Sequence, residues 1–363
     1  VSGTAGGAGA VMEDGTVVTT GSGNIRVVAI GLLRLGALST AGDVSLGAGS
    51  ITDAGTSGTN VTADELRIVT TGTSAGEGVG IGSNHLEIDV RRVAASVAGT
   101  GTGGLFLTER NAIDVGALSV ITVNRVNTDA TTTDVSAAVL GGLISSGHVV
   151  LQTQAGGIDT AVGSGVVTAA GNVLINAVGS GAGVTLAAAL TSTGGAVSLA
   201  ASAAITFTAE GDVSTVAGAS GTVDLQAGAA IAMADGAVIQ TVGAAVRAIA
   251  TGDITLGQID TRTTSDRDGN ALNAQSAWGS VSLTSSGGSI LDNANASVDV
   301  YANSLRLTAS AVGKGLGSSL NAVELEVATM SALAGSGGAY LSEASAVAVN
   351  SVAAVSVNRV GVT

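Results

Sequence analysis

The residues best suited to bind a metal ion lie in one polar stretch, Ser265-Asp-Arg-Asp-Gly-Asn270. Asp266, Asp268 and Asn270 alternate along it, and carboxylate and amide oxygens on a turn that contains glycine are ligands that calcium prefers. The stretch lacks the distal glutamate and the full set of oxygen ligands of a known calcium loop. The sequence therefore leaves two interpretations open: calcium bound by Asp266, Asp268 and Asn270, or an ordinary polar loop and no cofactor.

Two pairs of glutamates recur at matching places in the chain. Glu87 corresponds to Glu324, and Glu109 corresponds to Glu343. A pair of carboxylates is what glycoside hydrolysis requires, but clefts that cleave sugars also stack the sugar on aromatic rings, and this chain has only one Trp, two Tyr and two Phe. We interpret these glutamates as solvated surface carboxylates. We predict no catalytic residue and expect that the chain is not an enzyme.

The two histidines and two glycine-rich segments also have structural interpretations. A zinc site needs three or four converging ligands, and the chain offers only His85 and His148, without any cysteine. We interpret both as exposed strand residues. The glycine-rich segments 76–80 and 313–317 resemble nucleotide loops, but neither has the Lys-Ser/Thr ending or the following helix that phosphate binding requires. We interpret them as turns.

Composition excludes several classes of function. The net charge of −14 argues against nucleic acid and anionic membrane surfaces as partners. The absence of cysteine excludes disulfides and thiolate metal sites. No uninterrupted apolar run is long enough for a membrane-spanning helix, and no signal peptide follows Val1. We interpret the chain as a mature product or as a segment of something longer.

A short phrase recurs along the middle of the chain every 24 to 26 residues, counted between Gly147, Gly171, Gly195 and Gly221. Each of these glycines is followed by alternating apolar residues, as in Gly-x-Val-x-Leu-x-Ala, which is typical of a strand. A fixed period of this size indicates stacked units. The absence of proline agrees, because proline cannot donate to a ladder. We predict an all-β fold, a right-handed parallel β-helix with coils of about 24 residues.

A second repeat is much longer. Residues 12–17 match residues 233–238, and later segments match in the same order, at offsets between 221 and 239 residues. We predict a single continuous β-solenoid over residues 1–363. It contains copy one over 10–126, copy two over 231–363, intervening coils over 127–230 and a loop insertion at about 260–279.

The phrase and the long repeat predict which residues share an environment. The Val and Leu of each phrase lie two apart and should face the core. The residues between them should face outward: Val150, Leu174, Ser198 and Asp224. Leu66 and Leu305 should occupy equivalent positions in two coils, and so should Phe106 and Tyr340.

Several of these segments resemble a known group of proteins. They are the recurring Gly-x-Val-x-Leu-x-Ala/Thr phrase, Gly-Gly-Ser-Ile-Leu-Asp at 287–292 and Gly-Gly-Ala-Tyr-Leu-Ser-Glu at 337–343. In style and composition the chain resembles the repetitive region of giant bacterial surface proteins, the filamentous-haemagglutinin-like and large adhesin group. The resemblance implies right-handed β-helices that are exported to the cell surface and act as stalks or adhesive fibres.

We therefore expect a structural, non-catalytic extracellular protein, a segment of a long cell-surface fibre, sheath or adhesin stalk. The alternative is a carbohydrate-active β-helix, either a polysaccharide lyase or a glycan-binding module. Neither Val1–Ala5 nor the strand-like Val357–Thr363 looks like a cap for the open edge of a solenoid. The expected partners are further copies of the chain or adjoining repeats, end to end, and surface glycans, with no nucleic acid and no membrane-spanning segment.

Overall fold

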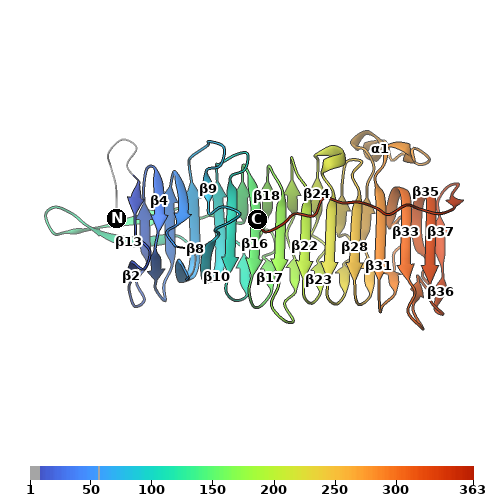
Figure 1. Cartoon of the computed structure of the whole chain (residues 1–363), viewed down its shortest axis with the longest axis horizontal. Coiled ribbons are helices and arrows are strands. Elements are labelled where there is room, and N and C mark those ends of the chain that lie inside the picture. The colour runs from blue at the N-terminus through green and yellow to red at the C-terminus, as the bar shows by residue number, and fades with distance from the viewer. Residues whose placement is uncertain (1–8, 56–57) are drawn as a thin grey trace. The chain divides into compact units, whose positions relative to one another are not determined.

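The computed structural model describes residues 9–55 and 58–363, so that Val1–Ala5 lie outside the described part. The chain forms two compact units: unit 1 is Val1–Gly171 with Val362–Thr363, and unit 2 is Asn172–Gly361. Each unit is built from short strands that pair in parallel with strands of the coils before and after them (Figure 1). The prediction of an all-β parallel solenoid is confirmed for each unit.

The strands of unit 1 are short, apart from β8 and β10. The first nine are β1 (Ala10–Val11), β2 (Val17–Thr19), β3 (Ile25–Val28), β4 (Leu32–Leu35), β5 (Ala37–Ser39), β6 (Val44–Ala48), β7 (Ser50–Asp53), β8 (Val61–Thr70) and β9 (Gly78–Val79). The others are β10 (Leu86–Val97), β11 (Gly104–Glu109), β12 (Ile113–Val115), β13 (Ile121–Val126), β14 (Thr132–Ala137), β15 (Leu143–Ser145), β16 (His148–Thr153), β17 (Ile158–Thr160) and β18 (Val167–Ala169).

Unit 2 repeats a pattern of three strands in each coil. It begins with β19 (Val173–Ala177), β20 (Val184–Leu186), β21 (Leu190–Ser192), β22 (Val197–Ala201), β23 (Ile205–Phe207), β24 (Val213–Thr215), the 3-10 helix η1 (Gly218–Ser220), β25 (Val223–Ala227), β26 (Ile231–Met233), β27 (Val238–Gln240), β28 (Val246–Ala250), β29 (Ile254–Leu256) and β30 (Gln258–Asp260). It continues with α1 (Thr264–Asp268), η2 (Gln275–Ala277), β31 (Ser280–Ser285), β32 (Ile290–Asp292), β33 (Val300–Ala309), β34 (Gly315–Leu316), β35 (Val323–Ala334), β36 (Gly338–Ala339), β37 (Leu341–Glu343) and β38 (Ala348–Val349).

The repeated phrase forms a column of side chains in the core of unit 2. Val173 pairs in register with Val197, and Val197 pairs with Val223. The column continues through Val246 and Val281, and all five valines are fully buried. In unit 1, the valine of the first phrase, Val149, pairs with Leu105. The period of the phrase is therefore the length of one coil, since each coil places the same residue on top of the last.

The long repeat also produces matching coils. Leu66 of β8 pairs with Val44, and Leu305 of β33 pairs with the corresponding residue, Val281. Both leucines are completely buried, so the prediction of equivalent positions is confirmed for this pair. Val, Leu, Ile and Ala fill most of the core because the interior between short parallel strands is narrow.

Phe106 and Tyr340 share a register but not an environment. Each follows a glycine pair that stacks on the preceding coil, Gly104 on Gly78 and Gly338 on Gly315. Phe106 is 6% exposed because β16 pairs along its strand, whereas Tyr340 is 41% exposed. The prediction of equivalent sites therefore holds for the pairing and is wrong for the burial.

The four residues predicted to face outward are all buried: Val150, Leu174, Ser198 and Asp224. In unit 2 the covering element is residues 350–361, which form no strand and run across the coils (Figure 1). Val360 donates its backbone N–H to Ser198, and Arg359 donates to Asp224. The expectation that Val357–Thr363 continues as strand is wrong, because its backbone bonds to side chains on the outer face of the coils.

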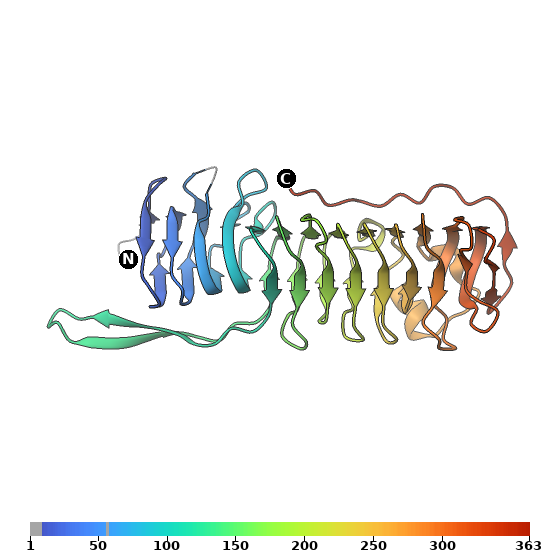
Figure 2. The ribbon, with the colours of Figure 1, turned by 90° about the horizontal axis from the view of Figure 1, so that it is seen from below.

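One pair of strands in unit 1 departs from the parallel pattern. β13 and β14 form an antiparallel hairpin, with Ile121 opposite Ala137 and Val126 opposite Thr132 (Figure 2). Side chains of the coils bond to its base, since Asn24 donates to the carbonyl of Thr122. Among the described residues, no helix has the length and apolar character needed to cross a membrane.

Candidate functional site

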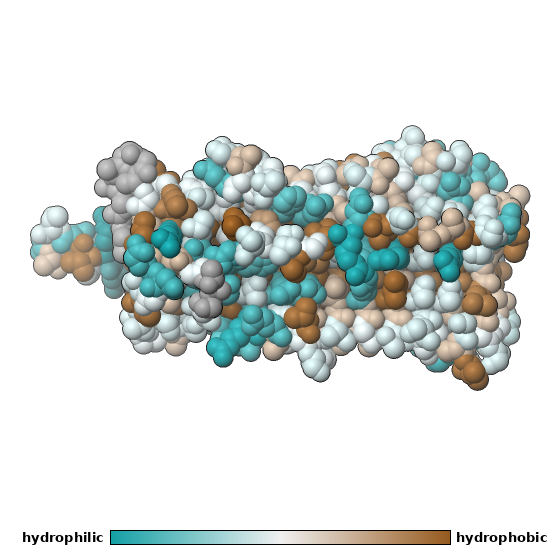
Figure 3. Space-filling view, viewed as in Figure 1, coloured by the Kyte–Doolittle hydropathy of each residue, from teal (hydrophilic) through white to brown (hydrophobic). Residues whose placement is uncertain are grey.

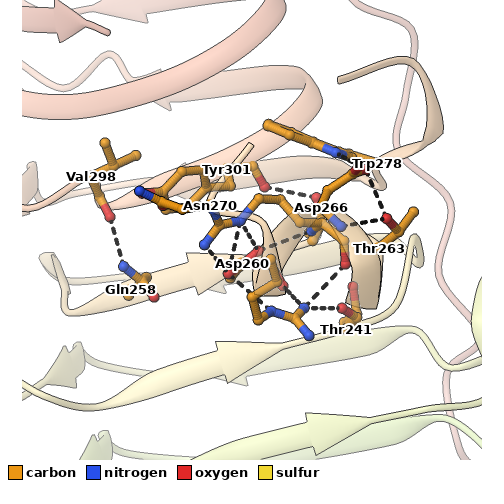
Figure 4. A network of polar contacts seen from close by, with 12 residues as sticks. Thr241, Gln258, Asp260, Thr263, Asp266, Asn270, Trp278, Val298 and Tyr301 are labelled. Carbon is orange, nitrogen blue, oxygen red and sulfur yellow. Dashed lines mark hydrogen bonds and ion pairs between the residues drawn. The ribbon is translucent and has the colours of Figure 1, made fainter. Parts of the chain in front are cut away.

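The sequence-predicted calcium residues lie in the segment between β30 and β31, which contains α1 and η2. Thr263 caps α1, because its hydroxyl accepts from the backbone N–H of Asp266 at 3.2 Å and donates to the Asp266 carboxylate at 2.7 Å. The indole N–H of Trp278 donates to the same carboxylate oxygen at 2.8 Å (Figure 4). These hydrogen bonds from Thr263 and Trp278 lower the pKa of Asp266.

The other two calcium candidates follow directly. Asp268 is the last residue of α1 and is exposed, and Asn270 has a positive φ of 47°. The side-chain oxygen of Asn270 lies 3.5 Å from a guanidinium nitrogen of Arg262. Oxygens of Asp266 and Asn270 thus have protein donors that fold the segment, and calcium binding by the three residues stays a prediction.

A buried network of ion pairs links the segment between β30 and β31 to Asp260, the last residue of β30 (Figure 4). Asp260 accepts from Arg262 at 2.7 Å and from Arg267 at 3.1 Å. Burial alone would raise the pKa of Asp260, but the hydrogen bonds and charges of the two arginines leave it below its usual value. The Arg262 guanidinium also lies 3.7 Å from the ring centroid of Tyr301. Trp278 and Tyr301 are at most 8% exposed, so both rings pack within the fold.

Glu109 and Glu343 have matching structural roles. Glu109 accepts backbone N–H groups from Val90 at 3.0 Å and from Asn111 at 2.9 Å. Glu343 accepts from Val327, the residue that corresponds to Val90, at 2.9 Å. The interpretation as solvated carboxylates is wrong for Glu109, which is completely buried under the preceding coil. This burial raises the pKa of Glu109 to about 7, although its backbone donors oppose the rise.

The histidines flank one aromatic ring in unit 1. His85 is 9% exposed; its Nδ1 lies 2.8 Å from the Thr108 hydroxyl and its Nε2 donates to the carbonyl of Val362 at 2.8 Å. The ring centroid of His85 lies 5.8 Å from that of Phe106, and the ring centroid of His148 lies 6.5 Å from that of Phe106. The prediction of an exposed residue is therefore wrong for His85, and His148 is half-buried, with a pKa lowered by burial.

A group of three carboxylates converges at one bend of unit 2. Asp292 ends β32, Asp299 directly precedes β33, and Glu324 lies in β35 of the next coil. One oxygen from each side chain lies within 4.8 Å of the other two. Asp292 is 6% exposed and Asp299 is 1% exposed, while Glu324 is half-buried. Parallel stacking explains the convergence, because the same bend of successive coils lies one strand spacing apart.

Each carboxylate keeps one oxygen without a hydrogen-bond donor. Asp299 Oδ2 accepts from the backbone N–H of Glu324 at 2.9 Å, and Asp292 Oδ2 accepts from that of Ala294 at 2.9 Å. The buried oxygens Asp292 Oδ1, Asp299 Oδ1 and Glu324 Oε2 have no donor among the described residues. Burial, with the nearby carboxylates of Asp292 and Glu324, raises the pKa of Asp299 to about 8.

The matching bend of unit 1 is built from Asp53, Asn60 and Glu87, which correspond to Asp292, Asp299 and Glu324 in the long repeat. Asn60 Oδ1 accepts from the backbone N–H of Glu87 at 2.9 Å, as Asp299 Oδ2 does from Glu324. Asn60 Nδ2 donates to Asp53 at 2.5 Å and to the carbonyl of Gly36 at 3.1 Å. The three compared side chains therefore differ in one atom, since the amide nitrogen of Asn60 in copy one is a carboxylate oxygen of Asp299 in copy two.

The candidate site is the carboxylate group of Asp292, Asp299 and Glu324, which can hold a cation or a proton. The sequence interpretation considered Glu324 alone, and the signal it did not use was the change from Asn60 to Asp299 between two otherwise similar segments. The remaining polar clusters hold coils, loop and tail in place. No protein family model, curated protein or solved structure matches this chain.

Proposed function

We propose that the chain is a structural, non-catalytic extracellular protein, a segment of a long cell-surface fibre, sheath or adhesin stalk. The observation that supports this most is that the long repeat folds into the same coil in each unit. Leu66 pairs with Val44 and Val93, and Leu305 pairs with Val281 and Met330 at the corresponding places. A solenoid built this way lengthens by repetition, because each coil buries its core only against its neighbours.

The chemistry of the polar clusters supports a structural role. Asp224 is 1% exposed and bonds two arginines, Arg247 at 2.9 Å and Arg359 at 2.9 Å. Asp260 and Glu109 similarly bind arginines or backbone N–H groups of adjacent segments. Groups that satisfy one another in this way stabilise the coils and are not exposed to a substrate.

The aromatic residues favour this proposal over a carbohydrate-active β-helix. Sugar rings pack on exposed aromatic faces, and four of the five aromatic side chains are at most 8% exposed. Tyr340 is the exception, at 41% exposed. The face drawn in Figure 3 mixes hydrophilic and apolar residues. Surface glycans remain a proposed partner of the fibre, without an assigned site.

The partners that we propose are further solenoid coils, from adjoining repeats or from another copy. In unit 1, β1 and β2 each pair with one later strand, and Val11 and Val17 nearby are about 60% exposed. In unit 2, β38 pairs with β35, and Val349 is 79% exposed. Within the described residues these strands have no second partner, and open strand edges beside exposed valines are templates for further parallel strands.

Surface labelling of the native organism tests the proposal. An antibody raised against the purified chain should label intact cells, and electron microscopy should place the label along filaments. Labelling that requires permeabilised cells would contradict the extracellular location. Turnover of an acidic polysaccharide by the purified chain would contradict the non-catalytic assignment and favour the lyase.

A further inference from the structure

We propose that Asp292, Asp299 and Glu324 form a calcium site in copy two of the long repeat, and that the matching bend of copy one does not bind calcium. This site is separate from the predicted loop ligands Asp266, Asp268 and Asn270. It goes beyond a structural role, because it makes the stability of one bend depend on a cation.

The buried oxygen of Asp299 indicates that a ligand is needed. Asp299 is 1% exposed and its Oδ1 has no hydrogen-bond donor in the described part of the chain, as is also true of Asp292 Oδ1 and Glu324 Oε2. One carboxylate oxygen from each of the three residues lies within 4.8 Å of the other two. A buried carboxylate oxygen without a partner is costly, and two neighbouring carboxylates add repulsion. A bound cation would satisfy all three oxygens and would neutralise most of their charge.

The ligand chemistry favours calcium among the common divalent ions. All the candidate ligands are carboxylate oxygens, which suit hard cations, and the chain has no thiolate to select a softer metal. Calcium accepts about six to eight oxygens in irregular arrangements, whereas magnesium demands a nearly ideal octahedron. The three side chains come from two coils and a bend, and the half-buried Glu324 leaves a side where water can complete the coordination.

Copy one has an amide, Asn60, in place of the middle carboxylate of this bend, although Asp53 Oδ2 and Glu87 Oε2 there are also buried without a donor among the residues described. The amide of Asn60 donates to Asp53 at 2.5 Å, at the position where Asp299 presents an oxygen to Asp292. In both copies the side chain at this position accepts a backbone N–H from the following coil: Asn60 accepts from Glu87, and Asp299 accepts from Glu324. The single change from amide to carboxylate therefore removes a donor, adds a charge and keeps the hydrogen bond to the backbone N–H of the following coil.

A proton is the competing occupant. A protonated Asp299 could donate to Asp292 and reproduce the hydrogen bond that Asn60 makes in copy one. The two occupants differ in what they respond to, because a proton is lost on raising the pH whereas calcium binding weakens on lowering it. Measurements at fixed pH with calcium added or removed separate them.

The test uses the full chain, treated with EDTA and then titrated with calcium chloride at pH 7.5. Hydrogen–deuterium exchange should show slower exchange in β33 and β35 with calcium, and calorimetry should show binding. Asp299→Asn, which copies Asn60, should remain folded, lose the calcium-dependent protection and lower the affinity of the site at least about tenfold. Asn60→Asp should add calcium-dependent protection around β8 and β10.

Controls distinguish this site from the loop and from a proton. Asp268→Asn should keep the calcium-dependent protection of β33 and β35. The proposal is overturned if Asp268→Asn abolishes that protection, if Asp299→Asn leaves it unchanged, or if exchange in this region responds to pH and not to calcium. Equal protection by magnesium at the same concentration would overturn the preference for calcium.

Discussion

Replacing Glu109 by glutamine should remove a pH dependence from the stability of unit 1. Glu109 is completely buried and accepts the backbone N–H groups of Val90 and Asn111. Glutamine has nearly the same shape but cannot ionise, and it has one acceptor oxygen for these two donors. The variant therefore loses a hydrogen bond at every pH, and it also loses the proton equilibrium of the carboxyl.

The magnitude follows from the shift in pKa, which rises from 4.5 to about 7 on folding. The difference of about 2.5 units corresponds to about 3 kcal/mol of unfolding free energy. Because the folded state holds the proton more tightly, this contribution is fully present below about pH 4.5 and is lost as the pH rises through 7. The unmatched N–H in the variant costs about 1–3 kcal/mol independently of pH. Glu109→Gln should thus be clearly destabilising near pH 4.5 and nearly neutral or stabilising near pH 8.5.

Hydrogen–deuterium exchange of peptides from β10 and β11, corrected for the intrinsic pH dependence of exchange, measures this locally. The difference in opening free energy between Glu109→Gln and the parent should change by about 3 kcal/mol between the two pH values. Glu343→Gln is the matched control, since Glu343 makes the same backbone hydrogen bond but is only half-buried, and it should show a smaller change. A difference for Glu109→Gln that is constant with pH would refute the reasoning.

Three further outcomes follow from burial and ion pairing. Leu66→Ala and Leu305→Ala should each destabilise their unit by about 2–5 kcal/mol in urea unfolding, because both side chains are fully buried. The control Leu320→Ala, at a 97% exposed position, should change the free energy of unfolding by less than about 0.5 kcal/mol. Arg359→Ala should speed proteolytic cleavage within residues 350–361 severalfold, with coil peptides as the internal standard. Asp224→Ala should lower the stability of unit 2 by about 3 kcal/mol in urea, since it leaves two guanidinium groups without their shared carboxylate; unchanged unfolding would show that these pairs contribute little.

The solenoid could be predicted because its determinants are local and repeated. Val173, Val197 and Val223 follow a turn glycine and alternate with other residues, so their spacing gives both the strand and the length of a coil. Parallel stacking then follows, because each coil is a near copy of its neighbour. The same reasoning correctly paired Leu66 with Leu305, since core positions depend only on alternation and register.

The burial of outward-facing residues could not be predicted from alternation. Ser198 and Asp224 point away from the core but are covered by residues 350–361, and Arg359 is 135 positions from Asp224 along the chain. The segment Val-Asn-Arg-Val has two structures in this chain. At 123–126 it pairs antiparallel with β14, and at 357–360 it binds side chains of unit 2. Identical local sequence gives different structures here because the neighbouring partners differ.

The carboxylate roles were only partly accessible from sequence. The match between Glu109 and Glu343 was visible, but its meaning depends on the bend that brings the N–H of Val90 to the carboxylate. Asp299 carries no local signal, since an aspartate before a strand is usually a solvated residue of a turn. It becomes notable only beside Asn60, once the register of the two copies is known.

The comparison of the two bends shows where a repetitive solenoid can vary. Core positions are constrained on both sides by stacked neighbours, so Leu66 and Leu305 are the same residue in the same register. A polar bend has one fixed requirement, an acceptor for the N–H of the next coil, and both Asn60 and Asp299 meet it. The other terminal atom of that side chain is an amide nitrogen in Asn60, which donates, and a carboxylate oxygen in Asp299, which accepts. If Asp299 binds calcium as proposed, one substitution is enough to give a repeat a cation site, and calcium would then stiffen selected bends of the proposed fibre while the others remain independent of it.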